Sequence, residues 1–228
     1  MANFHPHLNV GALITGTASA SLVAAGHVNL DIAIWLCFLG TLGGLLPDID
    51  SDNSTSLDTI FNLFAFAIIL IIMRYLTNAG FDDLSFIKVI AIPVLIYGFM
   101  KYVLRVIFER LTVHRGSCHS LLFLAFSGLM TTQLMTITTD HNDAVAWLSG
   151  GFVFLGGLVH LLLDEIYSVD LRNITIKRSF GSALKLIDLD SKLLALVMLF
   201  VCIGLGIINP ALSETFEVLS DWSRFSLF

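Results

Sequence analysis

Long runs of apolar residues, separated by short polar stretches, dominate this sequence. A helix needs roughly 20 mainly apolar residues to cross a bilayer. Only 13% of the residues are charged, whereas a soluble domain carries about 25%. The pattern therefore predicts an all-α protein: a polytopic transmembrane helical bundle forming a single integral membrane domain over residues 1–228. About seven spans are expected, at 9–26, 32–46, 60–76, 89–108, 121–138, 145–163 and 193–208.

Basic residues are distributed unevenly between the two sides that these spans define. One side receives the N-terminus, 47–54, 109–120 and 164–192, and it holds Arg110, Arg115, Arg172, Lys177, Arg178, Lys185 and Lys192. Because cytoplasmic loops are enriched in Lys and Arg, this side and the N-terminus are predicted to be cytoplasmic. Segment 164–192 mixes basic with apolar residues, and we expect it to lie on the cytoplasmic leaflet in contact with membrane lipids.

Histidines and aspartates gather at the same predicted ends of the spans. The set comprises His7, Asp48, Asp50, His114, His119, His160 and Asp164. His160 and Asp164 are four residues apart, so they share one face of a helix. Asp48 and Asp50 follow Pro47, and in an extended turn their side chains would face the same way. The sequence thus predicts a cluster of imidazoles and carboxylates at the cytoplasmic ends of the bundle.

Such a cluster has the donor atoms of a divalent metal site. Imidazole and carboxylate suit zinc, manganese or iron, and several carboxylates can hold two ions. We expect zinc first, with manganese, iron or magnesium as alternatives, and one or two ions. Each member also has a structural interpretation: Asp48 and Asp50 could cap helices, and His160 could form an interhelical hydrogen bond. Ionisable residues at membrane depth favour the functional interpretation.

The densest polar stretch is His114-Arg115-Gly116-Ser117-Cys118-His119-Ser120. If the chain turns at Gly116, the two imidazoles can converge on one ion. Arg115 could then hold an anionic group beside that ion. The alternative is a polar turn joining two helices, in which Arg115 caps carbonyls or anchors the chain to head groups.

Four motifs together resemble a known family. They are His7-x-x-x-Gly11, Leu46-Pro47-Asp48-Ile49-Asp50, the stretch 114–120, and Gly157-x-x-His160-x-x-x-Asp164. In this order they resemble the bacterial LexA-binding, inner-membrane-associated metal-dependent hydrolases, over about residues 7–186. The resemblance implies a location in the bacterial inner membrane and hydrolase activity, with an analogy to zinc-dependent phospholipase C-like enzymes. The family usually has Thr where this chain has Cys118.

Taken together, these observations predict a membrane-embedded metal-dependent hydrolase. Metal-bound water would attack a phosphoester or a lipid-like substrate, a phospholipid or other amphiphile, at the cytoplasmic interface. Arg115 would neutralise substrate charge, and Asp50 would act as a ligand or as a base. The alternatives are a metal- or proton-coupled transporter and a non-catalytic scaffold with a structural metal. A net charge of −6 and the lack of a basic patch with interleaved aromatics argue against nucleic acid as a partner, and protein partners cannot be read from the sequence.

Overall fold

The computed structural model describes most of the chain and divides it into two compact units. The first unit comprises Met1–Pro47 and Gly116–Phe228, and the second comprises Asp48–Arg115. The described residues are 4–50, 58, 61–62, 65–66, 68–69, 72–73, 76, 86–106, 118–139, 142–170, 175–176, 184–188, 192–223 and 225.

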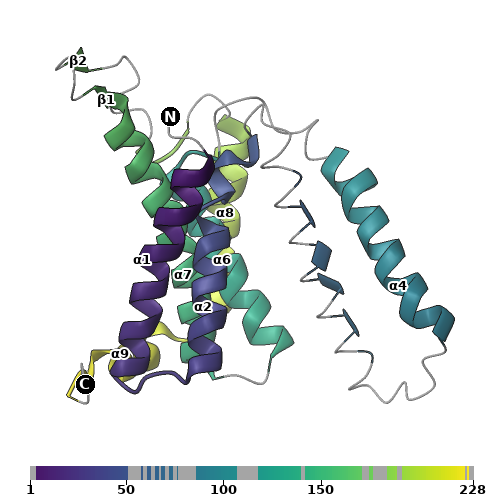
Figure 1. Cartoon of the computed structure of the whole chain (residues 1–228), viewed down its shortest axis with the longest axis horizontal. Helices are drawn as coiled ribbons and strands as arrows, with labels where there is room; N and C mark the ends of the chain where they lie inside the picture. Colours follow the sequence, from purple (N-terminus) through teal and green to yellow (C-terminus); the bar gives the residue numbers. More distant parts are fainter. Residues whose placement is uncertain are drawn as a thin grey trace. The chain divides into compact units, whose positions relative to one another are not determined.

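Helices make up almost all of the described part of the first unit, as Figure 1 shows. They are α1 (Phe4–Ala24), α2 (Leu30–Gly43), α6 (Leu121–Thr138), α7 (Asp143–Ser168), α8 (Lys192–Ile208) and α9 (Leu212–Ser220). A short 3-10 helix, η1 (Leu46–Asp50), follows α2, and two-residue strands β1 (Val169–Asp170) and β2 (Thr175–Ile176) pair antiparallel after α7. The predicted all-α fold is thus confirmed for the described residues, whereas the number of spans remains a prediction.

Two of the described helices are long and apolar enough to cross a membrane, α6 and residues 143–167 of α7. The predicted run 121–138 coincides with α6, and the first, second, sixth and seventh runs each fall mostly within a helix of this unit. The third run, 60–76, lies largely outside the described residues.

Helix α7 is the central element of the first unit, packed against α1, α2 and α6. Small residues permit this arrangement. A side chain on Gly156 would overlap the Gly40 carbonyl oxygen of α2, and one on Gly150 would overlap the Gly128 carbonyl oxygen of α6. Glycine lets helix backbones approach closely where lipid supplies no hydrophobic drive for packing. Glycines on two sides of α7 therefore hold it between α2 and α6.

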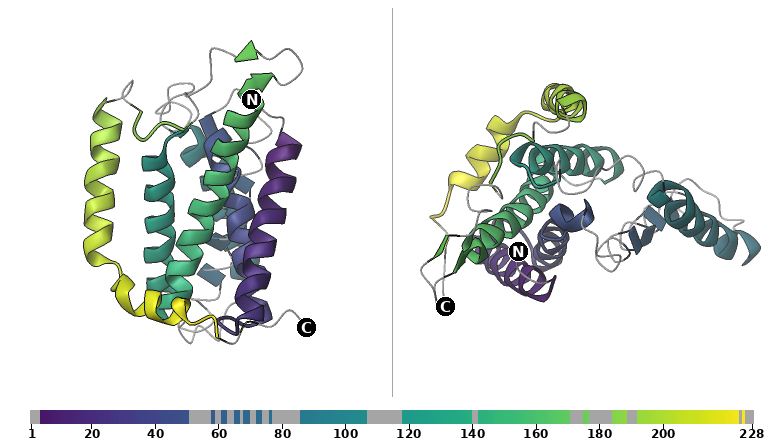
Figure 2. Two further views of the ribbon diagram at one scale, coloured as in Figure 1. Left: turned by 90° about the vertical axis from the view of Figure 1, so that its left-hand side faces the viewer. Right: turned by 90° about the horizontal axis from the view of Figure 1, so that it is seen from above.

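The structure changes two expectations about local conformation. Helix α7 continues through Asp164 to Ser168, so the predicted interfacial segment 164–192 begins inside a helix. The tail after α8 contains α9, which lies across the end of the unit opposite the start of α1 (Figure 2). No span was predicted after residue 208, and α9, with nine residues, is too short to be one.

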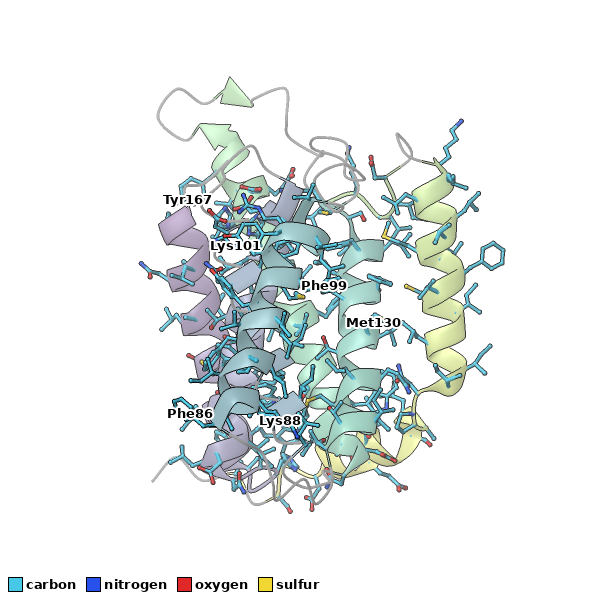
Figure 3. The ribbon with its side chains drawn as sticks, turned by 90° about the vertical axis from the view of Figure 1, so that its right-hand side faces the viewer. Phe86, Lys88, Phe99, Lys101, Met130 and Tyr167 are labelled. Atoms are coloured by element: carbon cyan, nitrogen blue, oxygen red, sulfur yellow. The ribbon has the colours of Figure 1, made fainter. Side chains whose placement is uncertain are left out.

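The second unit contains α4 (Phe86–Phe99), which continues as a π-helical turn, η2 (Met100–Leu104). Phe86 and Lys88 lie near one end of this rod and Phe99 and Lys101 near the other (Figure 3). Tyr97 donates a hydrogen bond to Asn62, and Arg105 forms an ion pair with Asp58. Polar contacts thus join α4 and η2 to the segment before them.

Candidate metal centre

Four buried side chains from three parts of the first unit converge at one place. His7 comes from the first turn of α1, and His119 lies two residues before the start of α6. His160 and Asp164 lie one turn apart near the end of α7. Their exposed fractions range from 1% for His160 to 8% for His119. Burying so many polar groups is costly unless they satisfy one another or a ligand.

The Asp164 carboxylate lies at the middle of this cluster. Its Oδ1 is 3.3 Å from Nε2 of His7, and its Oδ2 is 3.6 Å from Nε2 of both His119 and His160. The rings of His7 and His160 stack with centroids 3.7 Å apart, and the His119 ring stands edge-on to His160 at 5.8 Å. Three imidazoles therefore present the same ring nitrogen toward one carboxylate.

A backbone carbonyl orients the His160 ring. Nδ1 of His160 lies 2.7 Å from the carbonyl oxygen of Gly44. Because a carbonyl only accepts, Nδ1 carries the hydrogen and donates it, and in the neutral ring Nε2 then presents a lone pair to the cluster. Metal-binding histidines are commonly oriented by such a contact on their other nitrogen.

The close approach of α2 and α7 makes this contact available. Gly44 is the residue that ends α2, and its carbonyl would otherwise be one of the helix's unsatisfied terminal acceptors. Gly40 and Gly156 meet one turn before Gly44 and His160 on their respective helices. The glycine contact thus sets the separation at which His160 can reach the end of α2.

The start of α6 fixes the backbone beside His119. The Ser120 hydroxyl accepts a hydrogen bond from the backbone N–H of Phe123. The N–H groups of Leu121 and Leu122 donate to the carbonyls of Lys185 and Leu186 at 2.9 and 3.1 Å. The first-turn donors of α6 are therefore satisfied, and His119 is attached to a well-capped helix end.

The cluster geometry fits a divalent metal ion. Ligand atoms of His119, His160 and Asp164 lie within 4.8 Å of one another. In a tetrahedron with ligands about 2.1 Å from zinc, neighbouring ligand atoms are about 3.4 Å apart. The observed separations of 3.3 and 3.6 Å match that edge length and exceed the usual length of a direct hydrogen bond.

The other predicted site residues belong to the second unit: Asp48, Asp50, His114 and Arg115. The side chain of Asp50 lies outside the described residues, as do His114 and Arg115. One prediction about them was wrong. Residues 48 and 50 lie in the 3-10 helix η1 rather than in an extended turn, and residues two apart do not share a face at three residues per turn.

The groups that orient the ligands were not predicted from the sequence. Gly44 and the carbonyls of Lys185 and Leu186 act through their backbones, so residue chemistry gave no signal for them. A usable signal existed for Gly44. Gly40 and Gly44 have the small-xxx-small spacing of close helix contacts, and Gly156 and Gly157 precede His160 on the partner helix.

The apolar helices and the buried cluster together define an α-helical membrane protein with a polar centre at one end of its bundle. More particularly, the chain belongs to the YdjM inner membrane protein family, whose sequence model matches residues 1–211. No curated protein and no solved structure matches the chain. The resemblance to an inner-membrane family is confirmed, and the chain is an inner membrane protein. LexA binding, the multi-pass topology and the cytoplasmic N-terminus remain predictions.

Proposed function

We propose that this protein is a membrane-embedded metal-dependent hydrolase that acts on a phosphoester or lipid-like substrate at the cytoplasmic interface. The observation that carries this proposal is the convergence of three imidazole Nε2 atoms on the Asp164 carboxylate. A zinc-type site requires a group of nitrogen and oxygen donors at such separations. A metal ion in such a site lowers the pKa of bound water, which is the activation that hydrolysis needs.

The residues of the cluster have distinct roles in this proposal. His7, His119, His160 and Asp164 would hold the ion, which supplies Lewis-acid activation of water when bound. The Gly44 carbonyl keeps His160 in the binding tautomer. Burial among the helix ends excludes bulk water and strengthens the interactions of charged groups. On the basis of the sequence, we also propose three further ligands, which would allow a second ion: Asp48, Asp50 and His114.

Arg115 is proposed to neutralise charge on the phosphoryl group, with Asp50 as a ligand or base. A guanidinium offers donors only, so it cannot ligate the ion. Arg115→Lys should keep bound metal but lose bidentate geometry, with turnover per metal falling about 100- to 1000-fold. Turnover near that of the wild type would remove Arg115 from the chemistry.

A transporter is the main rival, and the buried hydroxyls argue against it. Transport requires polar groups that continue across the membrane. Thr15, Thr132 and Ser149 are fully buried, but each bonds to a carbonyl of its own helix one turn earlier. Among the described residues these hydroxyls therefore stabilise their own helices and do not extend the cluster into a path.

The test combines metal analysis with an esterase panel. Purified protein should hold metal and hydrolyse at least one phosphoester or phospholipid, and His160→Ala should lose both. The control is His27→Ala, because His27 follows α1 at the other end of the bundle. Bound metal without turnover on any member of the panel would contradict the hydrolase. Unfolding on metal removal would then favour a scaffold with a structural metal.

A further inference from the structure

Residues Leu184–Asp188, here called the strap, lie directly against the start of α6. Lys185 forms a parallel bridge with Ser120, so the two backbones are neighbours in the manner of paired strands, about 5 Å apart. Ser120 follows His119, a member of the metal centre. The strap is thus positioned one residue away from a proposed ligand, although it is 65 residues away in sequence.

The strap presents an apolar outer face. Leu186 is 70% exposed and Leu184 is also exposed, whereas Ile187 packs partly against the cluster formed by Leu122, Ala195 and Met198. Two exposed leucines are unfavourable in water but favourable against acyl chains in an inner membrane protein.

Beside these leucines the strap holds a cation. Nζ of Lys185 lies 3.4 Å from Oδ1 of Asp188, whose side chain is 2% exposed. The Lys185 side chain is 33% exposed and so reaches the surface, whereas the carboxylate that pairs with it is buried. An ammonium has three donors, and Asp188 is its partner within the described part of the chain. The remaining donors are available to an anion.

We propose that the strap is the site that captures the phosphate head group of an anionic membrane lipid. Lys185 receives the phosphate, and Leu184 and Leu186 contact the acyl chains. The inference deepens the proposed function and rests on it: the captured lipid would be delivered beside His119, so the substrate class becomes an anionic phospholipid. Phosphate and ammonium are complementary in charge, and the leucines select a lipid over free phosphate.

Native mass spectrometry of the full chain tests this proposal. The metal-loaded protein is offered phosphatidic acid or phosphatidylcholine, and the lipid retained on each variant is measured, together with bound metal. Wild type should prefer phosphatidic acid. Lys185→Gln should weaken that retention about ten-fold or more, because one charge-assisted contact is lost. Lys185→Arg should preserve it.

Two comparisons separate this site from unspecific effects. Lys192→Gln removes an exposed lysine at the start of α8, and it should leave retention unchanged. Leu186→Ser should weaken retention of phosphatidic acid without altering bound metal, and it remains informative if Lys185→Gln does not fold. Excess inorganic phosphate should displace little lipid from the wild type.

Three outcomes would overturn the proposal: full preference for phosphatidic acid in Lys185→Gln, an equal loss in Lys192→Gln, or complete displacement by inorganic phosphate. Failure of the proposed function appears differently. A chain that holds no metal, yet binds phosphatidic acid through Lys185, would retain the capture site without the hydrolase.

Discussion

The middle and the end of α7 meet their neighbours in opposite ways. In the middle, Gly150 and Gly156 bring the helix backbone against the backbones of α6 and α2. One turn beyond, His160 and Asp164 meet His7 and His119 through ring nitrogens and carboxylate oxygens. The first contact depends on the absence of side chains, and the second depends on which side chains are present.

This difference separates stability from function along a single helix. Close backbone packing gives dispersion contacts and fixes the distance between helices. The polar cluster contributes little net stability, because burying charged groups costs about as much as their attraction returns. We therefore expect substitutions at the cluster to change metal affinity at nearly constant stability, and substitutions at the glycines to change stability first.

The largest effect is expected from Asp164→Asn. The amide keeps the shape of the carboxylate but loses the charge at the centre of three imidazoles. Metal affinity should fall by more than about 100-fold. Mutating a residue that only orients a ligand already lowers metal affinity about 10- to 100-fold, and Asp164 is itself a proposed ligand. The unfolding temperature of the metal-free protein should stay close to that of the wild type. Isothermal titration with zinc and thermal circular dichroism measure the two quantities, and a large fall in stability would break the comparison.

Gly156→Ala should produce the opposite result. The added methyl group overlaps the Gly40 carbonyl oxygen, so α2 and α7 must separate. Overpacking of this kind costs about 1–3 kcal/mol in the free energy of unfolding. Zinc affinity should fall as well, but only because Gly44 withdraws from His160. An unchanged free energy of unfolding would show that the packing of α2 against α7 does not depend on this contact.

Ser120→Ala should have a smaller effect on both quantities. Its hydroxyl accepts from the N–H of Phe123 at the start of α6, next to His119. Loss of such a cap costs about 1 kcal/mol of stability. Zinc affinity should fall by about 10-fold, at the lower limit for a residue that orients a ligand. Ser120→Asn, which restores a capping oxygen, should recover most of the stability in the same melting experiment.

Gly151→Ala should have the smallest effect and serves as the matched control for Gly156→Ala. A methyl group at position 151 meets no atom within 4 Å. Alanine is favoured over glycine in a helix by about 1 kcal/mol, so stability should be unchanged or slightly higher. Zinc affinity should equal that of the wild type. If Gly151→Ala were as destabilising as Gly156→Ala, the close contact would not be the cause of either effect.

The sequence predicted the helices and much of the cluster for identifiable reasons. Apolar runs are long enough to mark α6, whose bounds coincide with the prediction, and the four-residue spacing places His160 and Asp164 on one face. For His7 and His119 the sequence predicted only that they lie on the same side of the membrane as His160 and Asp164. Residues at the same ends of spans need not be in contact. The structure shows this contact for the described residues, and metal binding itself remains a prediction.

Other features could not be predicted because they depend on backbone geometry. The extended turn predicted for Asp48 and Asp50 was wrong, since Pro47 is compatible with both an extended turn and a 3-10 helix. The contact of Gly44 with His160 and the strap at the start of α6 involve carbonyl groups, which every residue carries. These carbonyl groups differ from all others in the chain only in which residues lie next to them in space.

The central claim is that His7, His119, His160 and Asp164 ligate one ion, and X-ray absorption at the zinc edge of the zinc-loaded protein tests it most directly. The account predicts imidazole nitrogens and a carboxylate oxygen at about 2.0–2.2 Å, with the imidazole signal reduced in His160→Ala. A sulfur ligand at about 2.3 Å would instead identify Cys118, the buried neighbour of His119, as the ligand. That spectrum, or an unchanged imidazole signal in His160→Ala, would contradict the account.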